Sequence, residues 1–316
     1  MSEAQHKGEA FFERLRRIDP ALYLAGLDLA RDVRSPELRH VRAECLHGIL
    51  LGLAEAVRTI DFRDEIVVRA DGVFVRIDGV LLDALSQRYY LKASGHAQSS
   101  VARAMHDVLA SRGIRPKAMV DVGANYGEVS LWFARAYPEA RILAIEPVRD
   151  NVAVFERNLR AQPFETGRIT LLPMAVMDRT GTVHMTSGTS TTNQVVGGPK
   201  EGAEEVACDR LDSIMAKHGM EAADFVKIDI EGAEPYLAGA IGQLGARVGS
   251  YMIEFSKFAP REAYMKLATV LLAGGFAAFR EDGRTPLADA SAVQAHLQEV
   301  LAPKDVLVTN LWFFAR

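Results

Sequence analysis

Short apolar runs alternate with longer amphipathic stretches along the chain from about residue 117 onward. Such runs are typical of buried strands, and the stretches between them have the apolar spacing of helices. Strands that helices cover on both faces belong to parallel sheets, so this alternation predicts an α/β domain with a mostly parallel sheet over residues 116–316. The predicted strands are Ala118–Val122, Arg141–Glu146, Ile169–Met174, Phe225–Ile230 and Tyr251–Phe255.

The end of the chain has a different pattern, because no long helical pattern is recognised after Gly275–Arg280 or Val306–Phe314. We predict that these two apolar segments close the sheet as an antiparallel hairpin. Residues 187–202 are polar and rich in glycine, which predicts a surface loop. Two roles remain open for this loop, a lid over a substrate and a solvated loop without function.

The N-terminal part, residues 1–115, is predicted to form a helical region with a small β-hairpin. Apolar residues at helical spacing occur within residues 1–60 and again near Leu81–Leu91 and Ser99–Arg112. Glu65–Ile77 instead alternates apolar and polar residues around an Asp-Gly pair, which is a strong hairpin signal. We expect a cap or arm, and the apolar faces of its first helices are candidates for a homodimer contact.

Composition limits the classes of partner. The chain has 37 Lys and Arg against 41 Asp and Glu, so it lacks the excess positive charge that nucleic acid or an anionic membrane attracts. Its apolar stretch before Glu55 is too short to span a membrane, and its first residues lack a signal-peptide pattern. We therefore expect a cytoplasmic protein. Cys45 and Cys208 form no CxxC pair, so no disulfide framework is predicted.

The segment Asp121–Ser130 combines the end of a predicted strand with the start of a helix. Gly123 and Gly127 permit a tight turn that a ligand can approach closely, and the helix directs unpaired N–H groups toward that ligand. A dinucleotide fingerprint would require glycines where this chain has Asn125 and Glu128, so a diphosphate would meet a carboxylate. A cationic ligand end, such as the amino acid part of S-adenosylmethionine, fits better. A purely structural turn is the alternative.

Glu146 ends the second predicted strand, about 20 residues after the glycine turn, where an acid commonly holds a ribose. A carboxylate suits this role because it can accept hydrogen bonds from two adjacent hydroxyls. We therefore predict that Glu146 binds a ribose diol. The alternative is that it supplies negative charge to the N-terminus of the helix after Pro147.

Acidic residues cluster after the fourth predicted strand, at Asp229, Glu231 and Glu234, and Glu254 ends the next strand. Ligands of α/β sheets bind beyond the carboxyl ends of the strands, so these acids face the expected site. Three functions remain open: binding a cofactor's ammonium group, accepting a proton from a substrate hydroxyl, and holding a divalent ion. The structural alternative is that Lys227 pairs with Asp229 and that Glu234 begins a helix.

Histidine spacing gives no metal-binding pattern, so we predict no metal site. His184, just before the polar loop, is a candidate base, although a solvent-facing histidine on a strand is the alternative. The G-x-S-x-G turn of a hydrolase nucleophile is absent from the sequence.

Several of these motifs, in this order and spacing, resemble the FkbM family of S-adenosylmethionine-dependent methyltransferases. The resemblance covers residues 117–280. It implies the class I methyltransferase fold, a Rossmann-like sheet of seven strands with the last strand antiparallel. The motifs are Asp121–Gly127, Ala144–Pro147, Met174–Asp178 with Gly181, Cys208–Ser213 and Lys227–Glu234.

The resemblance also implies roles for single residues. Asp121, Gly123 and Asn125 would surround the methionine part of the cofactor, and Glu146 would bind its ribose. Ala175 would lie near the adenine. Asp229 and Glu231 would face the methyl group. The implied reaction is O-methylation of a sugar or of a secondary metabolite such as a polyketide.

We expect Asp229, Glu231 or Glu254 to act as the general base or to orient it, because an alcohol loses its proton as the new bond forms. Two rival functions remain. One is an NAD-dependent oxidoreductase on the same sheet, against which the missing glycines count. The other is a non-catalytic module that binds the cofactor and interacts through its N-terminal helices.

Overall fold

A computed structural model describes residues 65–70, 73–78, 101–162, 164–186, 195–196, 198, 203–303 and 306–316. The chain divides into two compact units, Met1–Ala97 and Gln98–Arg316. In the first unit, β1 (Glu65–Ala70) pairs antiparallel with β2 (Val73–Asp78), which confirms the predicted hairpin. The helices predicted within residues 1–60 and near Leu81–Leu91 lie outside the described residues, so the homodimer contact stays a prediction.

The second unit is built on an eight-stranded sheet of order β13-β12-β14-β11-β10-β3-β4-β5. The strands β5, β4, β3, β10 and β11 are parallel, whereas β14 is antiparallel to both of its neighbours. Apart from the short edge strand β13, this is the predicted seven-stranded sheet. Its strands are β3 (Ala118–Val122), β4 (Arg141–Ile145), β5 (Ile169–Leu172), β10 (Phe225–Ile228), β11 (Ser250–Ser256), β12 (Phe276–Phe279), β13 (Pro286–Leu287) and β14 (Val308–Ala315).

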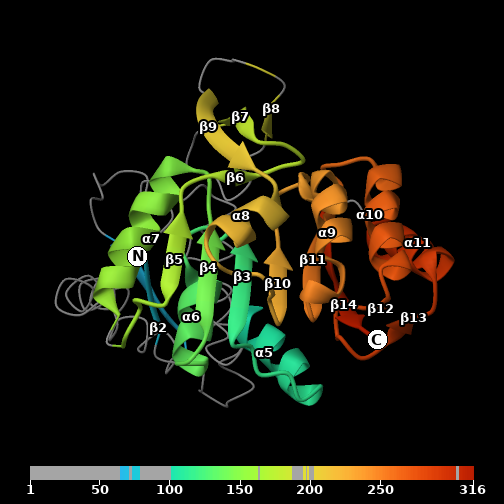
Figure 1. The fold of residues 1–316 in the computed structure, drawn as a ribbon, viewed down its shortest axis with the longest axis horizontal. Coiled ribbons are helices and arrows are strands. Elements are labelled where there is room, and N and C mark those ends of the chain that lie inside the picture. Colours follow the sequence, from blue (N-terminus) through green and yellow to red (C-terminus); the bar gives the residue numbers. More distant parts are fainter. Residues whose placement is uncertain are drawn as a thin grey trace, which may run out of the picture. The chain divides into compact units, whose positions relative to one another are not determined.

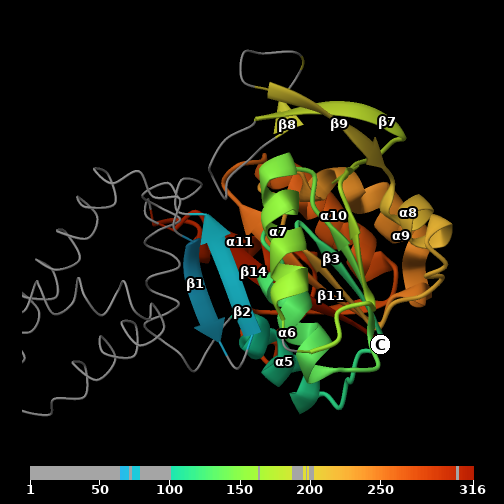
Figure 2. The same cartoon turned by 90° about the vertical axis from the view of Figure 1, so that its left-hand side faces the viewer.

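Helices cover both faces of this sheet (Figures 1 and 2). One face carries α5 (Val101–Ser111), α6 (Glu128–Ala136) and α7 (Arg149–Ala161), and the other carries α8 (Leu211–Lys217), α9 (Ala238–Leu244), α10 (Arg261–Ala273) and α11 (Ala290–Val300). Two short 3-10 helices are η2 (Glu234–Leu237) and η3 (Gly245–Arg247). Every residue of β10 and β11 is buried, which explains their nearly continuous apolar sequences. Among the described helices, none combines the length and apolarity needed to cross a membrane.

The prediction for the C-terminal segments is only half correct. β12 and β14 pair antiparallel as expected, with Phe276 opposite Ala315. They do not form a simple hairpin, because β13 and α11 lie between them in the chain. The sequence carries the signal for α11: Asp289 caps it by accepting a hydrogen bond from the Ala292 N–H, and Val293 and Leu297 are buried on one face.

A second, four-stranded sheet was not predicted from the sequence. Its order is β6-β9-β7-β8, and Figure 1 shows β7, β8 and β9 together above the central sheet. The predicted loop over residues 187–202 is wrong at Val195–Val196, which form β8 and pair with β7. Most of the other residues of that loop lie outside the described residues. The strands are β6 (Ala175–Val176), β7 (Gly181–Thr186), β8 (Val195–Val196) and β9 (Ala203–Asp209).

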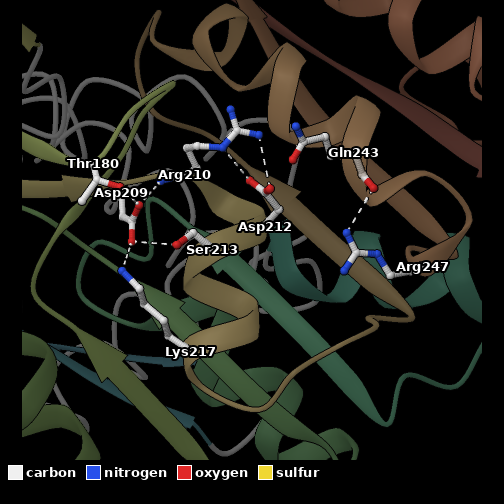
Figure 3. A network of polar contacts seen from close by, with 8 residues as sticks. All are labelled: Thr180, Asp209, Arg210, Asp212, Ser213, Lys217, Gln243 and Arg247. Carbon is white, nitrogen blue, oxygen red and sulfur yellow. Dashed lines mark hydrogen bonds and ion pairs between the residues drawn. The ribbon is translucent and has the colours of Figure 1, made fainter.

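Asp209 anchors the second sheet to α8 (Figure 3). Its carboxylate accepts hydrogen bonds from Thr180 Oγ1 at 2.6 Å, Ser213 Oγ at 3.0 Å, Lys217 Nζ at 2.6 Å and the Arg210 N–H at 2.8 Å. Burial alone would raise the pKa of Asp209, but these donors hold it well below its usual range. The Cys208–Ser213 motif therefore has a structural role, which is to hold the second sheet against α8.

Candidate active site

The turn after β3 passes so close to the end of β10 that only glycine fits at position 123. Gly123 has a φ of 77°, and a Cβ there would lie 1.8 Å from the Asp229 carbonyl oxygen. The two strand ends are also joined by a hydrogen bond from the Asp229 N–H to the Val122 carbonyl. The glycine turn and the first acid of the cluster are therefore packed directly against each other.

The rest of the turn has a left-handed backbone. Asn125 has a φ of 50° and Gly127 a φ of 88°, and a Cβ at Gly127 would lie 2.1 Å from the Phe155 ring. α6 begins at the next residue, Glu128, and burial raises the pKa of that carboxyl. The Asn125 Oδ1 atom is buried without a hydrogen-bond partner. A buried, unsatisfied acceptor of this kind is uncommon in folded proteins and is a suitable contact for a ligand donor.

Glu146 links this turn to α7, the helix that follows β4. It lies just beyond β4 rather than within the strand as predicted, and only 4% of its surface is exposed. Its carboxylate accepts from the Asn125 N–H at 2.8 Å, the Val148 N–H at 3.0 Å and Asn151 Nδ2 at 3.1 Å. Burial raises its pKa although these donors oppose the shift. The Val148 and Asn151 contacts agree with the role of placing negative charge at the N-terminus of α7. The role of binding a ribose is also possible, because one acceptor position of the carboxylate remains.

Ala175 lies in β6, where it is buried and pairs in register with Cys208. It belongs to a small apolar cluster that includes Val148, the residue whose N–H contacts Glu146. The predicted adenine neighbour and the predicted ribose ligand are thus connected through one intervening residue.

Asp121 lies beneath the turn and is completely buried. Its Oδ2 atom accepts a 2.6 Å hydrogen bond from Ser130 Oγ, and its Oδ1 atom lies 3.3 Å from Lys227 Nζ. Lys227 also lies 3.4 Å from Asp229 Oδ2 and donates to the Gly123 carbonyl at 2.7 Å. Burial would lower the pKa of Lys227, but the charges of Asp229 and Asp121 raise it above its usual range. Lys227 therefore stays charged and holds both strand ends together.

The structure brings Asp229, Glu231 and Glu254 together, with one carboxylate oxygen of each within 4.8 Å of the others. Burial and the negative charges of Asp229 and Glu234 raise the pKa of Glu231 to about 8. Burial, followed by the charges of Asp229 and Glu231, raises the pKa of Glu254 well above its usual range. Asp229 lies just past β10 and not within the strand as predicted, because β10 ends at Ile228 and not at Ile230. These three acids therefore form a crowded group at this edge of the sheet.

Glu234 has a role that sequence analysis missed. It begins η2 as expected of a helix start, but its carboxylate turns back and accepts from the Ile230 N–H at 2.8 Å and the Gly232 N–H at 3.0 Å. Tyr264 on α10 donates to the same carboxylate at 2.8 Å. These bonds hold Glu231 at a φ of 55°, which is uncommon for a residue other than glycine. Burial raises the pKa of Glu234 to about 7.

His184 does not belong to this group. It lies in β7 with its side chain 23% exposed, and its Nε2 atom is 3.9 Å from Glu205 Oε2. Two surface hollows also lie elsewhere. One, of about 550 Å³, follows α10 and includes Arg261 and Lys266, and the other, of about 330 Å³, includes Val152 and Leu171. Neither hollow brings several acidic side chains together, whereas the strand ends do, so we place the site at the strand ends.

The strand order, the antiparallel β14 and the glycine turn followed by an acid together define a class I methyltransferase fold. The Methyltransferase FkbM domain matches residues 121–281, about half of the chain. The chain belongs to this family, which confirms the resemblance inferred from its motifs. The cofactor of the family is S-adenosylmethionine.

A curated relative is the methyltransferase sdnD of Sordaria araneosa, which is 31% identical over 148 residues. The match covers 37% of this chain and 57% of that protein, so the chain spans little more than half the length of the relative.

Two solved structures are among those to which the chain is similar. The magnesium protoporphyrin IX methyltransferase of Synechocystis PCC 6803 is 13% identical, covers 74% of this chain and 85% of its own, and has a TM-score of 0.42. A SAM-dependent methyltransferase from Agrobacterium tumefaciens is 11% identical, with coverage of 82% and 72% and a TM-score of 0.45. At this similarity, the fold assignment depends on the strand order and the family match.

Proposed function

We propose that the chain transfers a methyl group from S-adenosylmethionine to a hydroxyl oxygen of a sugar or of a secondary metabolite such as a polyketide. The observation that carries this proposal is the convergence of Asp229, Glu231 and Glu254 at the strand ends where the Gly123 turn meets β10. Carboxylates suit an alcohol acceptor, which must lose a proton as it is methylated. The choice of a sugar or a secondary metabolite as the acceptor is taken from the resemblance to the FkbM family.

The residues around the turn are suited to the cofactor. Glu146 would accept from a ribose hydroxyl at its remaining acceptor position, and the apolar cluster with Ala175 would contact the adenine. The free Oδ1 of Asn125 and the carboxylate of Asp229 would accept from the ammonium group. When bound, the cofactor supplies a methyl group that its sulfonium has already activated. The task of the chain is then to align the acceptor oxygen, exclude water and receive the proton.

Exposed aromatic side chains next to the cluster support an organic acceptor. Tyr236 on η2 is 50% exposed and Phe258 after β11 is 38% exposed. Phe258 lies against the acidic turn, since a Cβ at Gly232 would be 2.8 Å from its Cβ. Exposed aromatic rings beside polar groups are typical of sites for partly apolar ligands.

The proposal predicts that the acids affect turnover more than cofactor binding. Formation of S-adenosylhomocysteine would be measured with a panel of sugar and polyketide-like alcohols for Asp229→Asn, Glu231→Gln and Glu254→Gln. We expect at least one variant to lose about 10²-fold or more in turnover, as loss of a general base does. Asp229→Asn should also weaken cofactor binding.

The matched control is Glu221→Gln, which removes an exposed carboxylate outside the cluster. It should turn over like the unmodified chain. If all three cluster variants keep full turnover, the acids do not take part in the reaction. If the chain binds S-adenosylhomocysteine but methylates no hydroxyl acceptor, the non-catalytic alternative is favoured.

A further inference from the structure

The three acids Asp229, Glu231 and Glu254 form a crowded group that can be fully ionised only if a further positive charge is present. Their oxygens lie within 4.8 Å of one another, and Glu254 is only 7% exposed. Ionised carboxylates at such separations repel strongly, and more so where little water screens them. A buried group of carboxyls persists in a protein when bound protons or a cation compensate the charge, and the raised pKa values of Glu231 and Glu254 show that protons do so when no cation is bound.

Lys227 does not supply enough compensation. Its ammonium has three donor hydrogens, and it already contacts the Gly123 carbonyl, Asp121 and Asp229. No ion pair reaches Glu231 or Glu254 within the part of the chain that the structure describes. The cluster therefore has room for a further positive charge.

An independent observation indicates where that charge belongs. The Glu254 Oε2 atom is buried and has no hydrogen-bond partner. Asn310 on β14 lies directly opposite Glu254 in the antiparallel ladder, and its Oδ1 atom is likewise buried without a partner. Side chains at paired positions of neighbouring strands project to the same face of a sheet. Two neighbouring residues on one face of the sheet thus each carry a buried, unsatisfied oxygen, and hard cations bind oxygen ligands.

We propose that Asp229, Glu231 and Glu254 bind a divalent cation such as Mg²⁺, with Asn310 Oδ1 as a neighbouring oxygen. Metal–oxygen distances of about 2.0 to 2.6 Å place the ligands of one ion at most about 5 Å apart, which agrees with the observed cluster. The proposal takes up one of the three functions that the sequence left open for these acids, and it departs from the prediction of no metal site, which followed from the lack of a histidine or thiolate pattern.

The cation would leave coordination positions for water or for the oxygen of an acceptor. A cation also lowers the pKa of a hydroxyl bound to it, which eases loss of the proton to solvent water, and the acids would then hold the ion in place of acting as the base. This part of the inference rests on the proposed function. Binding of the cation does not, because the protein supplies the ligands without a substrate.

The test uses the full chain in metal-free buffer. Mn²⁺, which prefers similar ligands and can be followed by electron paramagnetic resonance, would be titrated into the unmodified chain and into Glu254→Gln, Glu231→Gln and Glu221→Gln. We expect about one ion bound per chain. Each cluster variant should lose at least about tenfold in affinity, and the exposed control should lose none. Saturating Mg²⁺ should raise the Tm of the unmodified chain by about 5 °C or more.

Binding of S-adenosylhomocysteine to the same samples separates the two proposals. If the chain binds this compound but no Mn²⁺, the cation site is overturned and the methyltransferase proposal stands. If Mn²⁺ binds to both cluster variants as to the unmodified chain, the site is wrongly assigned. If Mn²⁺ binding depends on the cluster but S-adenosylhomocysteine is not bound, the cation site stands and the methyltransferase proposal fails. Two variants are used so that poor folding of one still leaves a result.

Discussion

Gly123→Ala is expected to destabilise the chain by about 3 kcal/mol or more and to abolish cofactor binding. Two costs combine in this variant. Alanine is strained at a φ of 77°, and its Cβ would lie 1.8 Å from the Asp229 carbonyl oxygen, which is backbone and cannot rotate away. Relieving the contact would separate the ends of β3 and β10, and with them the cofactor turn and the acids.

Gly219→Ala is the matched control for this prediction. Gly219 has a φ of 63°, so alanine is strained there as well, but a Cβ would meet nothing within 4 Å. We expect a loss of about 1 kcal/mol from the backbone alone. Denaturant unfolding and titration with S-adenosylhomocysteine would compare the two variants. Equal losses in both would mean that the close approach at Gly123 is unimportant.

Lys227→Met is expected to cost about 3 to 5 kcal/mol of folding stability, because it leaves the buried Asp121 carboxylate without its cation. The Lys227 side chain is only 6% exposed, so water cannot replace the ammonium without rearrangement. Loss of its bond to the Gly123 carbonyl should also loosen the cofactor turn. The free energy of unfolding and the affinity for S-adenosylhomocysteine should therefore fall together.

Lys217→Met provides the comparison for Lys227. Its side chain is 61% exposed, and its partner Asp209 keeps three other hydrogen-bond donors when the lysine is removed. We expect a loss of about 1 kcal/mol and unchanged cofactor binding. A loss at Lys227 no larger than at Lys217 would contradict the view that Lys227 holds the strand ends together.

The sequence predicted the features that depend on burial and on strand ends. β3, β4, β10 and β11 are predicted correctly because strands buried on both faces require apolar runs, and the edge strand β5 keeps enough apolar residues to show the same pattern. Glu146 and the turn at Gly123 were placed at one site because neighbouring parallel strands end at the same edge. The hydrogen bond from the Asn125 N–H to Glu146 is a direct consequence of this arrangement.

Features that depend on tertiary contacts were missed. β6 and β8 have two residues each, too few to show periodicity, and only the last two residues of β9 are buried, so the second sheet is not recognised from the sequence. The bond between Tyr264 and Glu234 joins residues 30 positions apart and requires α10 to pack against the acidic turn. The α11 pattern of a capping Asp289 and buried Val293 and Leu297 was present in the sequence but not identified.

The central claim is that the Gly123 turn and Glu146 together bind S-adenosylmethionine, and calorimetric titration with S-adenosylhomocysteine tests it most directly. The account predicts binding to the folded chain at about one per chain, and a loss of about tenfold or more in Glu146→Ala, since the ribose would lose its acceptor. Glu156→Ala, which alters an exposed acid on α7, should bind normally. Folded chain that shows no uptake of the compound, or Glu146→Ala that binds as tightly as the unmodified chain, would contradict the account.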